Sequence, residues 1–244
     1  MKQLNIKALT TNTDRHISEF MPSSGMDIPT VYKDAYELAV NIGDDFLRQL
    51  CLGILDDLQA LWLTAPAAKG VHHAYTAGTL IHSFSVATLA KTIASGIPEA
   101  NVDLATAGGL LHDIGKLFGY RINGIVCEMT DGGMLFDHLF MGAEFVGNHA
   151  ENLKLITDDA AEAKLEMLRH IILSHHGSQE HGAVISPASL EAHIVFHADS
   201  MDSIAEMIRD ASRKVTKIKW TDKIWALNNR PHLSTEYTQT VMSV

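Results

Sequence analysis

The chain has 244 residues, of which 46% are hydrophobic and 20% charged, a composition typical of a globular protein with one large domain or two small ones. Its formal net charge of −10 argues against a protein that grips nucleic acid over a wide surface. No apolar run reaches the roughly 18 residues that span a bilayer, so no membrane partner is expected.

Helical periodicity dominates the chain. Residues 31–65 carry apolar side chains every three to four positions and break near Gly43, which predicts two helices. Asn-Gly and Asp-Gly-Gly sequences among β-branched residues predict a small β-hairpin insertion near residues 119–135. The predicted fold class is therefore all-α with a minor β-excursion, and its remaining predicted helices are residues 79–96, 99–116, 136–153, 160–176 and 187–212.

We predict three parts, an N-terminal extension (1–30), a helical domain (31–212) and a basic C-terminal tail (213–244) that packs on the domain or extends from it. Seven of the 19 Lys and Arg residues fall between residues 209 and 230. This run is interpreted first as a solvated helix and tail, with an arm that contacts phosphate groups as the alternative.

The two cysteines, Cys51 and Cys127, lie far apart, and the first 16 residues lack the apolar stretch of an export signal. A disulfide is therefore not expected, and the reducing cytoplasm is the expected location. Cys51 has apolar neighbours at helical spacing, which predicts that its thiol fills space in the core.

Histidines and aspartates interrupt several of the apolar helices. The segment GGLLHDIGK (108–116) sets His112 and Asp113 side by side among small and apolar residues, where each unpaired polar group would cost roughly 1–3 kcal/mol. One buried histidine is more often hydrogen-bonded than metal-bound, but a shared metal site would satisfy all such positions on five helical segments. These positions are His82, His112, Asp113, His138, His175, His176 and Asp199.

Imidazole nitrogen and carboxylate oxygen together suit Mn, Fe, Co, Ni or Zn, and Mn²⁺ is the first choice. We expect Asp113 to bridge two ions, because a carboxylate can give one oxygen to each. Asp202 follows Asp199 by three residues and shares its helix face, so it either orients a ligand histidine or is solvated.

The order of these residues resembles that of the HD-domain metal-dependent phosphohydrolases, which have a histidine, a later His-Asp pair and a distant aspartate. His138 with Gly142, and the pair His175–His176, are similar to the additional ligands of the two-metal members. The resemblance implies one ion bound by His82, His112, Asp113 and Asp199, and a second bound by Asp113, His138, His175 and His176.

Residues 35–232 resemble more narrowly the HD portion of bacterial 3′–5′ exoribonucleases that join an OB-fold to an HD domain. Segments such as DHLFMG (137–142) and TDKIWALNNRP (221–231) carry this likeness. It implies a two-metal 3′–5′ exonuclease on single-stranded nucleic acid that releases nucleoside 5′-monophosphates. It also implies that Asp113 and Lys116 are catalytic, with Lys116 holding a phosphate oxygen, and that His73 faces the substrate. The alternatives are an exposed lysine at a helix end for Lys116 and a loop or N-cap residue for His73.

An OB-fold would not fit ahead of residue 30, so nucleic acid is held in another way or the substrate is smaller. This departure and the acidic charge keep a nucleotide or cyclic-nucleotide phosphohydrolase as an alternative function. A relaxase-like HD module is a looser likeness, and a non-catalytic nucleotide sensor is a further alternative. The sequence has a histidine or aspartate at every ligand position of the family, which favours an enzyme.

Overall fold

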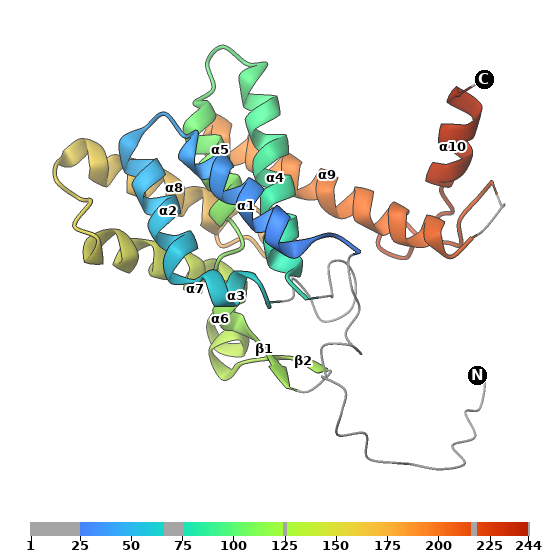
Figure 1. Cartoon of the computed structure of the whole chain (residues 1–244), viewed down its shortest axis with the longest axis horizontal. Coiled ribbons are helices and arrows are strands. Elements are labelled where there is room, and N and C mark those ends of the chain that lie inside the picture. Colours follow the sequence, from blue (N-terminus) through green and yellow to red (C-terminus); the bar gives the residue numbers. More distant parts are fainter. Residues whose placement is uncertain (1–24, 66–75, 124–125, 216–218, 244) are drawn as a thin grey trace.

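The computed structural model of the chain describes residues 25–65, 76–123, 126–215 and 219–243. Across these residues the protein is a helical bundle with one two-stranded sheet, which confirms the predicted fold class (Figure 1). In chain order the elements are α1 (Ile28–Val40), α2 (Asp45–Asp57), α3 (Gln59–Trp62), α4 (Gly78–Ser95), α5 (Val102–Leu111), α6 (Lys116–Gly119), β1 (Tyr120–Asn123), β2 (Val126–Met129), α7 (Asp131–Asn152), α8 (Asp159–Ser174), a 3₁₀ turn (Gln179–His181), α9 (Leu190–Arg213) and α10 (Thr235–Met242).

Helices α4 and α5 pack against each other in the core of the bundle (Figure 1). Every residue of α5 from Leu104 to Leu111 is buried, as expected of a helix enclosed by other helices. Gly109 permits close approach to α4, because a Cβ atom there would lie 2.7 Å from the Cα of Ala87. Since α5 ends at Leu111, this packing buries the residues that follow it directly.

The predicted break near Gly43 is confirmed, because α1 and α2 are separate helices. The Asp103 carboxylate accepts hydrogen bonds from the backbone N–H groups of Gly43 (3.0 Å) and Asp44 (2.8 Å). Asp44 in turn caps the first turn of α2 by accepting a hydrogen bond from a backbone N–H. These contacts attach the turn between α1 and α2 to the start of α5.

The predicted β-hairpin is present, but it ends earlier than residue 135. β1 and β2 pair in antiparallel fashion, and Thr130 then caps α7 by accepting a hydrogen bond from the Gly133 N–H at 3.0 Å. The Asp-Gly-Gly sequence assigned to the hairpin therefore forms the first turn of α7. Gly133 is needed there because a Cβ atom would overlap the carbonyl oxygen of Gly119.

Helix α9 packs on α4 and α5, extends beyond the bundle and carries α10 near its far end (Figure 1). The sequence had not predicted α10. None of the described helices combines the length and the apolar character needed to cross a membrane. The division into residues 1–30, 31–212 and 213–244 stays a prediction.

Candidate metal centre

The helices bring all seven predicted ligand residues together. Their side chains form overlapping groups of three in which one nitrogen or oxygen atom from each residue lies within 4.8 Å of the others. The seven residues are His82 in α4, His112 and Asp113 directly after α5, His138 in α7, His175 and His176 directly after α8, and Asp199 in α9.

Asp113 occupies the middle of this cluster, and its two carboxylate oxygens face different imidazoles. Its Oδ2 atom lies 3.4 Å from the Nε2 atoms of both His82 and His112. Its Oδ1 atom lies 3.3 Å from Nε2 of His138 and 3.6 Å from Nε2 of His175. The carboxylate is thus placed between two separate sets of nitrogen atoms.

The group on the Oδ2 side contains a second carboxylate. The Nε2 atoms of His82 and His112 are 3.2 Å apart, and Oδ1 of Asp199 lies 3.1 Å from His82 Nε2. Both imidazoles are buried, and 17% of the Asp199 side chain is exposed. Two nitrogens and two carboxylate oxygens therefore converge on one small volume.

The group on the Oδ1 side consists of imidazoles. His138, His175 and His176 form one of the three-residue groups, and the ring centroids of His175 and His176 are 4.4 Å apart. A further group joins His112, His175 and Asp199, so the two sides are continuous.

Backbone carbonyl groups fix the orientation of two of these imidazoles. Nδ1 of His112 donates a hydrogen bond to the Gly109 carbonyl, and Nδ1 of His175 donates one to the Ile172 carbonyl, each at 2.8 Å. Because a carbonyl oxygen only accepts, Nδ1 carries the proton in both rings. In the neutral rings the Nε2 lone pairs then point into the cluster, as metal binding requires.

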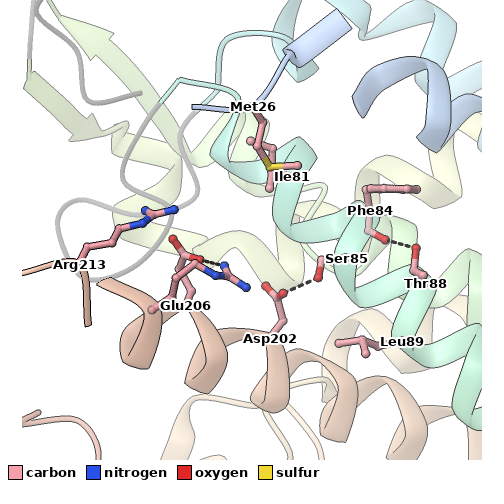
Figure 2. A pocket seen from close by; sticks show the side chains of 10 residues that line it. Met26, Ile81, Phe84, Ser85, Thr88, Leu89, Asp202, Glu206 and Arg213 are labelled. Atoms are coloured by element: carbon pink, nitrogen blue, oxygen red, sulfur yellow. Dashed lines mark hydrogen bonds and ion pairs between the residues drawn. The ribbon is translucent and has the colours of Figure 1, made fainter. Parts of the chain in front are cut away.

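Asp202 orients His82 from the other side of the ring. Its Oδ2 atom lies 2.7 Å from Nδ1 of His82, and its Oδ1 atom accepts a hydrogen bond from Ser85 at 2.5 Å (Figure 2). Of the two interpretations that the sequence left open for Asp202, the structure agrees with the buried orienting residue.

Asp137 is a contact residue that sequence reasoning missed. Its Oδ1 atom lies 2.5 Å from Nδ1 of His138, and it also accepts a hydrogen bond from the His138 backbone N–H. Within α7, Asp137 has φ 59° and ψ 160°, a conformation rare for any residue but glycine. This kink turns the carboxylate toward the ring that follows it in the sequence.

The two aspartates of the cluster are ionised. Burial would raise the pKa of Asp113, but the Lys116 ammonium and His112 hold it well below its usual range. Burial would likewise raise the pKa of Asp199, but the hydrogen bond and charge of His82 lower it. Two negative charges therefore lie among buried bases, an arrangement that attracts cations.

The imidazoles divide into two kinds. Burial alone would lower the pKa of His82, but hydrogen bonds with Asp199 and Asp202 raise it to about 9. Burial lowers the pKa of His175 well below its usual value and also lowers that of His176. His175 and His176 are thus neutral at pH 7, whereas a metal ion would have to displace a proton from His82.

Several polar atoms of the cluster are buried without a hydrogen-bond partner among the described residues. They include Oδ1 of Asp113, Nε2 of His138 and Nδ1 of His176. Such an atom costs about 1–3 kcal/mol unless something satisfies it. Divalent cations would satisfy these atoms, and nitrogen with carboxylate oxygen is a suitable donor set for transition metals, so the residues fit the metals that the sequence predicts.

Of the two residues predicted to contact substrate, one lies at the cluster. Nζ of Lys116 is 2.6 Å from Oδ2 of Asp113, and 14% of the lysine side chain is exposed. His73 lies outside the described residues. His197, close to Asp199 in the sequence, is exposed and contacts the ring of Phe196 instead.

Comparison with known proteins places this geometry in a family. The HD domain matches residues 79–204, more than half of the chain and the part that holds all seven clustered residues. A relative, the 3′–5′ exoribonuclease YhaM of Oceanobacillus iheyensis, is 27% identical over 231 residues, which cover 94% of this chain and 71% of the relative. No solved structure matches the chain. The chain belongs to the HD domain family and is a phosphohydrolase that depends on divalent metal.

Proposed function

We propose that the protein is a two-metal 3′–5′ exonuclease that acts on single-stranded nucleic acid and releases nucleoside 5′-monophosphates. The observation that carries the two-metal part is the position of Asp113. Its Oδ2 and Oδ1 atoms face separate sets of imidazole nitrogens at 3.3–3.6 Å. A carboxylate placed in this way can give one oxygen to each of two ions.

The proposed ligands follow the two sides of Asp113. Bound cations would activate water and stabilise negative charge on the phosphate and the leaving group. One ion is assigned to His82, His112, Asp113 and Asp199, and the other to Asp113, His138, His175 and His176.

The remaining residues hold the ligands and the substrate. Carbonyl and carboxylate partners on Nδ1 keep the Nε2 atoms of His82, His112, His138 and His175 directed at the cluster. The pKa of Lys116 is raised because the charge of Asp113 outweighs the effect of burial, so the ammonium stays charged. We propose that it binds a phosphate oxygen of the substrate, and that His73 faces the substrate as well.

The substrate class is supported by the relative named as a 3′–5′ exoribonuclease, which aligns with 94% of this chain. Mn²⁺ is the proposed metal because the donors mix imidazole and carboxylate, and Fe, Co, Ni or Zn ions are the other candidates.

Digestion of a single strand that carries a label at its 5′ end tests the proposal. Wild-type protein with Mn²⁺ should give a ladder of shortening labelled products and unlabelled nucleoside 5′-monophosphates. Immediate release of a labelled mononucleotide would show that hydrolysis starts at the 5′ end, contrary to the proposal. Matched RNA and DNA strands decide between the two nucleic acids, and a strand blocked at its 3′ end should resist.

The net charge of −10 favours the second candidate, a nucleotide or cyclic-nucleotide phosphohydrolase, because small substrates need no extended basic surface. A panel of nucleoside phosphates and cyclic nucleotides separates the two functions. Turnover of a panel member while labelled strands remain intact would select the small-molecule enzyme.

A further inference from the structure

The far end of α9 carries a surface that the metal centre does not use. We call the last residues of α9 (207–213), the following Lys214 and residues 219–233 the C-terminal arm. This arm lies at the end of α9 that extends beyond the bundle (Figure 1). Whatever it does, it acts at a distance from the clustered imidazoles.

Large aromatic rings are exposed on the arm. Trp225 is 84% exposed and Trp220 is 50% exposed, although tryptophan is highly buried on average. Hydrogen bonds hold the backbone around them, because antiparallel bridges join Trp220 to Leu233 and Ile224 to Arg230. The protein therefore displays these rings on a fixed support.

Cationic groups surround the rings. Lys214 and Lys223 line the same cavity of about 310 Å³ as Trp225, together with Asp210 and Asp222. Nζ of Lys219 lies 6.0 Å from the ring centroid of Trp220, and Arg230 lines a second cavity beside Trp220. Between residues 209 and 232 the chain has seven of its 19 Lys and Arg residues but two of its 29 Asp and Glu residues.

The arm is continuous with the metal centre through α9. Asp199 in α9 and Lys214, the residue directly after α9, are 15 residues apart, which corresponds to about 22 Å at the helical rise. A cavity of about 450 Å³ lies between α4 and α9, where Arg213 and Phe84 line it together with Asp202 and Glu206 (Figure 2). Arg209 also lines it and forms an ion pair with Glu206. Several nucleotides of an extended strand would cover this span.

We propose that the C-terminal arm binds the single strand upstream of the 3′ end that is hydrolysed. Bases stack on Trp225 and Trp220, and the ammonium groups of Lys214, Lys219 and Lys223 neutralise phosphates, as in proteins that bind single strands without sequence preference. The inference rests on the proposed exonuclease function. The arm would give an acidic chain a local surface that binds nucleic acid. A locally basic surface matches a polyanion rather than a second acidic copy of this chain.

Fluorescence anisotropy with a labelled single strand of about 12 nucleotides, in EDTA to prevent hydrolysis, measures this binding directly. Trp225→Ala should raise Kd about tenfold, within the range expected for one stacked base. Trp225→Phe should restore most of the affinity. Met242→Ala, which removes another exposed apolar side chain outside the arm, should leave Kd unchanged. The logarithm of the association constant falls as the logarithm of the salt concentration rises. Joint replacement of Lys214 and Lys223 by Ala should make this negative slope shallower by about 1.4.

The dependence of kcat/KM on the length of the nucleic-acid strand is a second measurement, which a purely structural role of the arm would leave unchanged. For wild type, kcat/KM should be larger for the 12-nucleotide strand than for a dinucleotide, which is too short to span about 22 Å. Trp225→Ala should reduce that ratio. An unchanged Kd in Trp225→Ala, with strands still degraded, would overturn the arm but leave the exonuclease standing. If light scattering showed that wild type is a dimer and Trp225→Ala a monomer, the arm would be an interface between copies of the chain. That result would overturn the proposal. Failure of wild type to bind or cut any strand would reject both proposals.

Discussion

His82 and His112 face one carboxylate oxygen of Asp113, whereas His138 and His175 face the other, and the two sides are built from different materials. On the Oδ2 side, Asp199 adds a second carboxylate at 3.1 Å from His82. The support behind that side is also anionic, because the buried Asp202 carboxylate accepts from His82 at 2.7 Å.

The Oδ1 side has less negative charge. Its other members are the neutral rings His175 and His176, together with His138. The carboxylate behind His138 belongs to Asp137, whose side chain is 61% exposed. Since charge and burial both strengthen the attraction for a cation, we expect the Oδ2 side to bind its ion more tightly than the Oδ1 side.

Replacement of Asp113, which both sides share, should abolish the difference in metal affinity because neither side should then bind an ion. Asp113→Ala should take up no metal and show no hydrolysis, because each side loses an anionic oxygen and a buried partner for its imidazoles. Elemental analysis of protein loaded with Mn²⁺ should change from about two ions to about zero. Asp44→Ala removes a partly buried aspartate elsewhere and should keep both ions. A fully loaded, active Asp113→Ala would contradict the bridging role.

A second way to disturb both sides is to push the segment that carries Asp113 away from α7, which carries His138. Gly115 packs directly on α7, where a Cβ atom would overlap the His138 carbonyl oxygen and lie 2.7 Å from the Gly142 nitrogen. Gly115→Ala should therefore lower the free energy of unfolding by about 3 kcal/mol, measured by urea denaturation, because backbone atoms cannot rotate away. Gly96→Ala is the control, since its Cβ atom would lie 3.5 Å from the Ile93 carbonyl oxygen, an ordinary van der Waals contact. Its effect should stay within about 1 kcal/mol. Equal effects in the two variants would contradict the close contact.

Removal of one ligand from each side should show the difference itself. Asp199→Ala should lose the tighter ion and His176→Ala the weaker one, so each protein should retain about one ion per chain. The ion left in His176→Ala should resist a competing chelator longer, because Asp199 and Asp113 both remain beside it. His197→Ala, an exposed residue of α9, should bind both ions like wild type. Identical chelator resistance in the two variants would remove the proposed ranking.

The sequence predicted the members of the cluster better than their supports. His82 and His112 could be singled out because each interrupts an apolar helix, and the structure brings both to Asp113. Their binding of metal stays a prediction. Asp202 was visible through its helical spacing from Asp199, although spacing alone could not decide whether it is buried.

Asp137 could not be identified from its sequence position. Successive residues of a regular helix point about 100° apart, so a carboxylate would not reach the ring of the next residue. The positive φ of Asp137 changes this, and no local sequence signal marked it. The hairpin boundary was missed for a related reason, since Gly133 reads as a turn residue but serves the contact with Gly119.

The supports should differ in strength as the two sides do, with the smallest effect at Asp137. Replacement of a carboxylate that orients a ligand histidine commonly weakens metal affinity about 10–100-fold. Asp202→Asn should be near the upper value, because its carboxylate is buried and also bonds to Ser85. Asp137→Asn should be near the lower value, because water can replace an exposed carboxylate, and asparagine tolerates a positive φ better than most residues. Metal titration against a chelator should show Asp202→Asn weakening the tighter ion and Asp137→Asn the weaker one. If Asp137→Asn weakened the tighter ion instead, the assignment of His138 to the Oδ1 side would be wrong.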